Sequence, residues 1–568
     1  MNHFKQMTNA IVEIPLRSPD VVMKLERLGA LFPNRLSFAR SLIRRMATEN
    51  WSISREKFDL NDQGIGTAIY KITTPIFPIW FVVFADNLEV SDRTDRVIAE
   101  KWDATFTLTT EEPQEHKLQY LKKNIPLQEA GRCTSSEMIL SRANKSVRLF
   151  DYVAEQLASG QQPDLTKLME VGYLMRTTAV YGNGKFGLAD FELLKEQGLF
   201  KLPFQAEMLC VYLARNFSFD WVEGIARKMN PQSCCRLDGN LKKALGVGNA
   251  TGLGMAPFLV KHPKLISNWI STREQALQRI INVKKISMEK KIHFTAVLEQ
   301  AKMHIEEWLT TDQQQKINLS RLIKELENIT FFDQFLESKN GWCRLSNWSN
   351  ERFSIETQEL INSVLIEIYP ELVDDLETET GADENMYLIP DMVLHELEAI
   401  IDSRYSWAMT FNGKEKTNNA RFWYASEDKA EPRFGWRYYE PGVEKEMRIG
   451  IAQEVQVLKK ALAQKKKAAV NLTVAEFLIS NPEFREIIQR IQSLQSYPYA
   501  EIRDNLLGKF CRPIDLLRCK LAMFGATKFD PKSDLWIRIT LFQGAPLAEK
   551  LHHEDFDSWL FPAFKNRF

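Results

Sequence analysis

The sequence predicts a predominantly helical α+β fold, in which a small mixed or antiparallel sheet near the N-terminus joins a large helical body. Three short segments rich in β-branched and aromatic residues occur at 67–73, 80–84 and 102–109, and turn residues separate them. From residue 264 onward, apolar residues recur at helical spacing through long segments that contain few glycines. A late apolar segment at 535–542 also has strand character, and we expect it to complete the same sheet.

The expected helices follow from apolar residues that recur every three or four positions. Pro33 interrupts the first helical segment, and Pro390 suits the first turn of a later helix. An acidic run at 374–381 has the composition of an exposed loop. The segments that we expect to be helical are 19–49, 111–157, 264–338, 356–376, 390–403 and 444–467.

A chain of 568 residues is expected to hold more than one domain. Changes of pattern along the chain predict an N-terminal domain of helix and small sheet at 1–110. A helical core with two glycine-rich loops follows at 111–345. The C-terminal domain, at 346–568, is expected to be helical with an aromatic and charged hairpin and one late strand.

Composition argues against several classes of partner. The 74 Lys and Arg residues balance the 74 Asp and Glu residues, so the basic excess typical of general nucleic-acid binders is absent. The most apolar window, at 76–85, has about half the length that a membrane-spanning helix needs. The seven cysteines are odd in number and widely scattered, which fits a reducing compartment. We therefore expect a cytoplasmic protein that binds neither nucleic acid nor membrane and has no metal site.

Two glycine-rich segments, at 181–187 and 246–257, define the candidate site. Glycine costs backbone entropy, so such clusters indicate either positive φ angles or main-chain amides that lie close to a ligand. We expect both segments to be loops, the second leading into a helix at Pro257. The main-chain amides at 249–254 would then bind an anion. The alternative interpretation is that the glycines permit close packing.

Side chains near these segments have the chemistry of an anion clamp and of proton transfer. Arg176 is suited to charge-assisted hydrogen bonds with a carboxylate or phosphate. Tyr181 and Lys185 are the candidate general acid and base, provided that burial lowers the lysine pKa. His262 is a further catalytic candidate, with a turn cap as the alternative. The candidate substrate-binding residues here are Arg176, Thr177, Thr178, Asn183, Asn249 and Thr251.

A basic pattern lies upstream of the glycine-rich segments. Arg142, Lys145 and Arg148 follow i+3 spacing, which places them near one face of a helix. That face is either solvated or an anion-binding surface over the glycine-rich loops.

Residues 421–439 alternate aromatic and charged side chains around a central turn. Such a hairpin is either exposed and linked by salt bridges, or it lines a polar pocket with rigid walls. The candidate substrate-binding residues in and before this segment are Arg404, Tyr405, Lys429, Arg433 and Arg437.

The second glycine-rich segment is similar to loops of two known families. Gly248, Gly252 and Gly254 resemble the cofactor loop of short-chain dehydrogenases. That resemblance implies NAD(P) bound at a loop between a strand and a helix N-terminus. Residues 252–257 with Lys261 are similar to the signature loop of the helical lyase family of fumarase and argininosuccinate lyase, which implies lyase chemistry in a helical body.

The preferred hypothesis is a soluble enzyme that acts on a small carboxylate or phosphate metabolite by lyase-like or transferase-like acid–base chemistry, without metal or dinucleotide. One alternative is an NAD(P)-dependent oxidoreductase that uses the loop at 248–254. The other is a non-catalytic helical scaffold that binds protein. The sequence is also compatible with a homo-oligomer.

Overall fold

The computed structural model describes most of the chain, and the statements below concern the described residues. The residues outside this description are 1–14, 90–100, 126–135, 178–197, 203, 253–258, 261, 329–332, 382–385, 416–420, 425–444, 449, 466–470, 504–511, 513, 534–535, 554 and 566–568.

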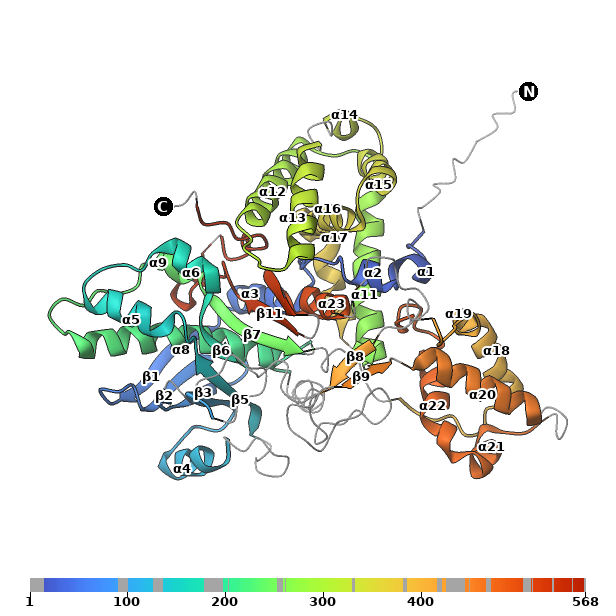
Figure 1. Ribbon diagram of the computed structural model, residues 1–568, viewed down its shortest axis with the longest axis horizontal. Helices are drawn as coiled ribbons and strands as arrows, with labels where there is room; N and C mark the ends of the chain where they lie inside the picture. Colours follow the sequence, from blue (N-terminus) through green and yellow to red (C-terminus); the bar gives the residue numbers. More distant parts are fainter. Residues whose placement is uncertain are drawn as a thin grey trace, which may run out of the picture.

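A nine-stranded sheet crosses the molecule in the order β1-β2-β3-β4-β5-β6-β7-β11-β10 (Figure 1). Its neighbouring strands are antiparallel except for β6 and β7, which are parallel. The expected mixed α+β fold is confirmed, but the expectation of a small sheet beside a predominantly helical body is partly wrong. The strands are β1 (Ser52–Leu60), β2 (Gly66–Thr73), β3 (Ile79–Ala85), β4 (Ala104–Thr109), β5 (Glu137–Lys145), β6 (Tyr173–Thr177), β7 (Gly246–Gly252), β10 (Lys528–Ser533) and β11 (Trp536–Leu541), with β8 (Arg421–Tyr424) and β9 (Lys445–Arg448) paired separately.

The three strands expected near the N-terminus are confirmed as β2, β3 and β4. Phe81 and Phe106 lie on the sheet face that packs into the main core. Val82 and Phe84 lie on the other face, in a smaller apolar cluster with helix α4 (Glu115–Asn124). Because both faces are covered here, both sets of alternating side chains are apolar, and the sequence signal is strong.

The helix expected at 111–157 is wrong in its middle, where β5 separates α4 from α5 (Phe150–Ala158). The i+3 spacing of Arg142 and Lys145 therefore places them on opposite faces of a strand. The helix expected at 444–467 is confirmed from 451 to 465 as α20, with β9 preceding it.

The late strand is confirmed as β11. It belongs to the same sheet as the early strands, but its neighbours are β7 and β10. The sheet thus contains strands from all three expected segments, namely β1–β4 from 1–110, β5–β7 from 111–345, and β10 and β11 from 346–568.

Helix α8 (Gln205–Met229) packs across β4–β7 and against α5. Figure 1 shows helices α12, α13, α15, α16 and α17 grouped on one side of the sheet, and α18 to α22 grouped beyond one end of it. The other helices before α18 are α1 (Pro19–Val22), α2 (Leu25–Leu28), α3 (Phe38–Thr48), α6 (Leu165–Val171), α9 (Gly239–Ala244), α11 (Pro263–Ile281), α12 (Met288–Glu306), α13 (Gln313–Glu327), α14 (Asp333–Leu336), α15 (Gly341–Arg352), α16 (Ile355–Ile368), α17 (Pro370–Val373) and the 3-10 helix η5 (Asp374–Thr380). Those that follow are α18 (Leu394–Arg404), α19 (Ser406–Met409), α20 (Ile451–Lys465), α21 (Val474–Ser480), η8 (Pro482–Phe484), α22 (Arg485–Leu494), α23 (Asp515–Phe524) and η9 (Ala548–Lys550).

A buried ion network attaches the N-terminal segment, residues 15–48 with helices α1 to α3, to this helical body. Arg17 donates to Glu274 at 2.6 Å and to Glu359 at 2.8 Å. Arg27 and Arg273 each donate to Glu359 at 2.5 Å. Glu359 is fully buried, so its charge depends on these three guanidinium groups.

The acidic run at 374–381 is exposed at Asp374, Asp375, Thr378 and Glu379, as its composition suggested, but it is not a loop. It forms η5, which packs against α11, and Leu376 within it is buried. Two of its carboxylates face arginines of the N-terminal segment: Arg35 Nη2 donates to Asp374 at 2.8 Å, and Arg44 Nη2 donates to Glu377 at 2.8 Å.

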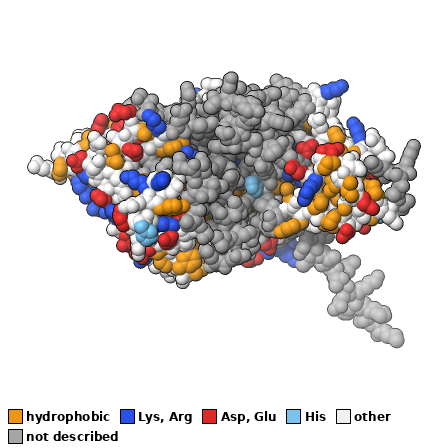
Figure 2. Space-filling view, turned by 90° about the horizontal axis from the view of Figure 1, so that it is seen from below, with side chains coloured by type: hydrophobic (Ala, Val, Ile, Leu, Met, Phe, Trp, Pro, Cys, Tyr) orange, Lys and Arg blue, Asp and Glu red, His pale blue; other side chains and the backbone are white. Residues whose placement is uncertain are grey.

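Within the described residues, no helix has both the length and the apolar character needed to cross a bilayer. On the face drawn in Figure 2, charged side chains of both signs are interspersed with apolar ones at the two ends of the molecule. This mixture agrees with the zero net charge of the chain.

Candidate functional site

The parallel pair β6 and β7 lies next to the two glycine-rich parts of the sequence, since β6 ends four residues before the first, which is outside the described residues, and β7 forms the start of the second. Because the strands run in the same direction, their carboxyl ends point toward the same edge of the sheet, and β7 extends three residues beyond the level at which β6 ends. In sheets with parallel strands, ligands commonly bind at the carboxyl ends. The chain leaves this edge at residue 177 after β6 and at residue 252 after β7.

Residues 253–257 of the second glycine-rich segment lie outside the described residues. The segment at 246–252 is a strand, and the expectation that it forms a loop is wrong. It pairs with β6 on one side and with β11 on the other, where Asn249 pairs with Ile539. The main chain of β7 is therefore occupied by the sheet. A helix, α9, precedes the strand. In the dehydrogenase loop, by contrast, the glycines lie between a strand and a helix N-terminus.

Close packing accounts for two glycines of β7. A Cβ atom on Gly248 would lie 2.5 Å from the ring of Tyr173 on β6, and one on Gly246 would overlap the carbonyl oxygen of Leu541 on β11. These glycines allow neighbouring groups to approach closely, as the packing interpretation predicted.

Thr177 and Asn249 lie on the core face of the sheet, the face that packs against α8. Thr177 Oγ1 is 3.1 Å from Ser141 Oγ on β5, and the Asn249 side-chain amide donates to the carbonyl oxygen of Thr177. All three side chains are buried. Their hydrogen bonds link β5, β6 and β7 where β6 ends.

Arg176 lies on the opposite face, since neighbouring residues of a strand alternate. Its partners in register are Asn144 on β5 and Gly248 on β7. Arg142, two residues before Asn144, shares this face. Arg538 of β11 shares it too, because it pairs with the residue two positions after Gly248. We call this surface, defined by Arg142, Arg176 and Arg538, the arginine face.

The arginine face is partly shielded from water. Arg176 is 9% exposed, and the guanidinium of Arg142 lies 4.6 Å from the ring centroid of Trp102. Burial lowers the pKa of Arg142, because a charged guanidinium loses hydration there. At the usual strand spacing, the strands of Arg142 and Arg538 are about 14 Å apart, with that of Arg176 between them. Guanidinium groups in this setting favour anionic partners and bind carboxylates or phosphates through paired hydrogen bonds.

Of the remaining expected site residues, the structure describes Arg404, Tyr405, His262 and the main chain of Thr251. Arg404 is exposed at the end of α18, and the buried hydroxyl of Tyr405 donates to Glu501 at 2.8 Å. His262 occupies the N-cap position of α11. Thr251 lies in β7, but its side chain is not described. The expected residues that lie outside the described residues are Thr178, Tyr181, Asn183, Lys185, Lys429, Arg433 and Arg437.

The i+3 spacing of Arg142, Lys145 and Arg148 indicated a basic surface in the sequence, although that spacing is typical of a helix and Arg142 lies in a strand. The sequence contained no comparable signal for Arg538, because only the pairing of β11 with β7 brings that residue to the site.

Within the described residues, no cluster of three or more His, Cys, Asp or Glu side chains is arranged to hold a metal ion. Comparisons with protein-family models, with curated proteins and with solved structures found no match.

Proposed function

We propose that this protein binds a small carboxylate or phosphate metabolite on the arginine face and acts on it as an enzyme. The observation that supports this proposal is the placement of Arg142, Arg176 and Arg538 on one face, beside the carboxyl ends of a parallel strand pair. Three positive charges on strands β5, β6 and β11 of one sheet suit a ligand with more than one anionic group.

The chemistry proposed is proton transfer of the lyase or transferase type. Tyr181 and Lys185 remain the candidate acid and base, because the sequence reaches them directly after β6. A lysine near several arginines would have a lowered pKa, which suits a general base.

A thermal-shift screen of carboxylates, phosphorylated metabolites and nucleotides tests this proposal. A ligand that binds the native state raises the melting temperature by mass action. Arg176→Gln and Arg142→Gln should each abolish the shift, whereas exposed Arg148→Gln should retain it. A ligand whose shift survives both substitutions would contradict the arginine face as its site. For a confirmed ligand, turnover that is lost in Lys185→Ala while binding is retained would support catalysis.

Two alternatives remain as outcomes of this screen. A response to dinucleotides alone would favour the NAD(P) oxidoreductase, although the strand at 246–252 gives that alternative no support. The non-catalytic scaffold predicts glycine loops packed between helices, whereas Gly248 packs against Tyr173 of the neighbouring strand β6. It predicts that no ligand shifts the wild type.

A further inference from the structure

The C-terminal segment, residues 555–565, is an irregular stretch with a deeply buried surface. It contains neither strand nor α-helix in its described residues, yet Trp559, Phe561 and Phe564 are each at most 3% exposed. Such burial requires that other elements supply its contacts. Those contacts come from parts of the chain that are distant in sequence.

One face of α12 contacts the main chain of this segment. Gln300 Nε2 donates to the carbonyl oxygen of Phe561 at 2.8 Å, and His304 Nδ1 lies 2.7 Å from that of Pro562. The Glu307 carboxylate, just beyond the helix, accepts the main-chain N–H of Phe564 at 2.8 Å. It also accepts that of the next residue at 2.8 Å. The three side chains are spaced i, i+4 and i+7, so they form one stripe along the helix. These three side chains contact main-chain atoms of the segment. The same hydrogen bonds could therefore form if the segment carried different side chains.

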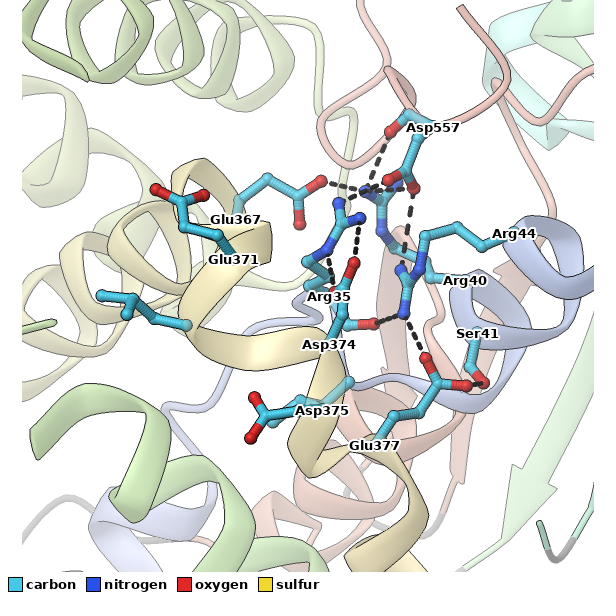
Figure 3. Close-up of polar contacts among 12 residues, drawn as sticks. Arg35, Arg40, Ser41, Arg44, Glu367, Glu371, Asp374, Asp375, Glu377 and Asp557 are labelled. Carbon is cyan, nitrogen blue, oxygen red and sulfur yellow. Dashed lines mark hydrogen bonds and ion pairs between the residues drawn. The ribbon is translucent and has the colours of Figure 1, made fainter. Parts of the chain in front are cut away.

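A second contact holds the Asp557 carboxylate among arginines of the N-terminal segment (Figure 3). Arg40 Nη2 donates to the Asp557 carbonyl oxygen at 2.9 Å and to its carboxylate at 3.2 Å. Arg35 donates to the same carboxylate, and Arg44 Nη1 lies 3.7 Å from it. Glu367, Asp374 and Glu377 complete the network. Hydrogen bonds between charged groups are the stronger kind, so Asp557 is an anchor.

Ring contacts fix the intervening residues. The Trp559 ring stacks on Phe542 with centroids 6.1 Å apart, and the Arg40 guanidinium lies 5.3 Å from its centroid. Pro562 lies against Gly544, where an added Cβ would be 2.6 Å from the proline Cβ. A larger residue at 544 would displace the segment.

We infer that α12, the arginines of the N-terminal segment and the turn at Gly544 form a peptide-binding site, whose ligand is the chain's own residues 555–565. Main-chain hydrogen bonds combined with a few side-chain anchors are typical of peptide recognition. The ligand class is an extended peptide with a carboxylate at one position and aromatic rings two, four and seven positions later, as in Asp557, Trp559, Phe561 and Phe564. Because the segment adds no strand to the sheet, it can leave without disrupting the strand order. This inference does not depend on the proposed enzymatic function.

Binding of a synthetic peptide to the full-length protein tests the inference. A fluorescent peptide with the sequence of residues 555–565 is titrated into wild type and into Asp557→Asn, whose own segment is weakened. Asp555→Asn is the control, since the Asp555 carboxylate is exposed and lies 3.7 Å from the Lys243 ammonium group. We expect the peptide to bind Asp557→Asn at least tenfold more tightly than wild type or Asp555→Asn. A peptide that binds none of the three, or all three equally, would overturn the inference.

Hydrogen exchange of the full-length wild type provides a second test that needs no variant. The amides of Phe564 and Lys565 should exchange through a local opening, at lower denaturant concentration than the amides of β3. Glu307→Gln should increase their exchange at least tenfold, whereas exposed Glu306→Gln should not. Exchange of these amides only through global unfolding would overturn the inference. Protection that depends on protein concentration would also overturn it, because the ligand would then come from a second copy.

Discussion

His304 is a buried imidazole whose two ring nitrogens both face main-chain carbonyl oxygens. Nδ1 is 2.7 Å from the oxygen of Pro562, and Nε2 is 3.0 Å from that of Thr527. Burial, with a smaller contribution from Lys528, lowers the pKa of His304 to about 3. The ring is therefore neutral at pH 7 and donates to only one of the two oxygens.

This neutral histidine should make the protein sensitive to mild acid. The pKa in the folded state lies below the usual value of about 6.5 that applies to the unfolded chain, so protons bind preferentially to the unfolded state as the pH falls below 6.5. Between pH 7 and pH 5 the wild type should lose about 2 kcal/mol more unfolding free energy than His304→Gln. Denaturant titrations at both pH values measure the difference, with exposed His395→Gln as the control. An equal loss in wild type and His304→Gln would contradict the neutral ring.

Glu359 provides a second residue-level prediction. Burial alone raises the pKa of Glu359, but Arg17, Arg273 and Arg27 outweigh burial and hold the pKa well below its usual range. Glu359→Gln leaves these guanidinium groups without their shared carboxylate, which should cost about 3–5 kcal/mol of unfolding free energy. Exposed Glu379→Gln should change it by less than about 0.5 kcal/mol. A loss below about 1 kcal/mol in Glu359→Gln would show that the network contributes little.

Sequence reasoning identified Arg176, Thr177 and Asn249 as one group. The structure confirms that they are neighbours, but strand alternation separates Arg176 from the other two. Reasoning from loops could not predict this separation, because a loop has no alternating faces. Arg538 reaches the same face only because β11 pairs with β7, and the sequence does not show that pairing.

At the level of elements, β7 shows why a glycine pattern misleads. The expected strands β2 to β4 were recognisable because branched and aromatic side chains fill both of their faces. In β7, Tyr173 and groups of β11 occupy the space beside Gly248 and Gly246. The sequence of β7 thus lacks the apolar pattern of a strand, and its small residues were predicted to form a loop.

A methyl group added to β7 at Gly248 should destabilise the protein. Gly248→Ala places a Cβ atom against the Tyr173 ring, and overpacking of this kind costs about 1–3 kcal/mol. Gly239→Ala is the matched control, because an added Cβ there meets no atom within 4 Å. Thermal and denaturant unfolding of the two variants measure the difference. A Gly248→Ala protein as stable as wild type would contradict the packing role.

At the level of the whole molecule, the sheet joins the beginning and the end of the chain. Strand β7 lies between β6 and β11, although β11 follows it in the sequence by about half of the chain length. Periodicity reports which segments are strands but not which strands pair over such a separation. The order of the sheet was therefore beyond sequence reasoning.

Separate expression of residues 1–345 and 346–568 tests whether the expected domains are independent. The first fragment lacks β11, so it exposes the edge of β7, and exposed edges promote aggregation. We expect each fragment alone to be poorly soluble and the two together to form a soluble complex. Two soluble fragments that do not associate would contradict this expectation.

The most direct test of the proposed function is a calorimetric titration of an anionic ligand, selected by the thermal-shift screen, into wild type, Arg142→Gln, Arg176→Gln and Arg538→Gln. If the three guanidinium groups share the ligand, each substitution should weaken binding by at least tenfold, about 1.4 kcal/mol or more. Exposed Arg148→Gln should bind as the wild type does. Affinity that is unchanged in all three arginine-face variants would show that the ligand binds elsewhere, and the arginine face would then not be the functional site.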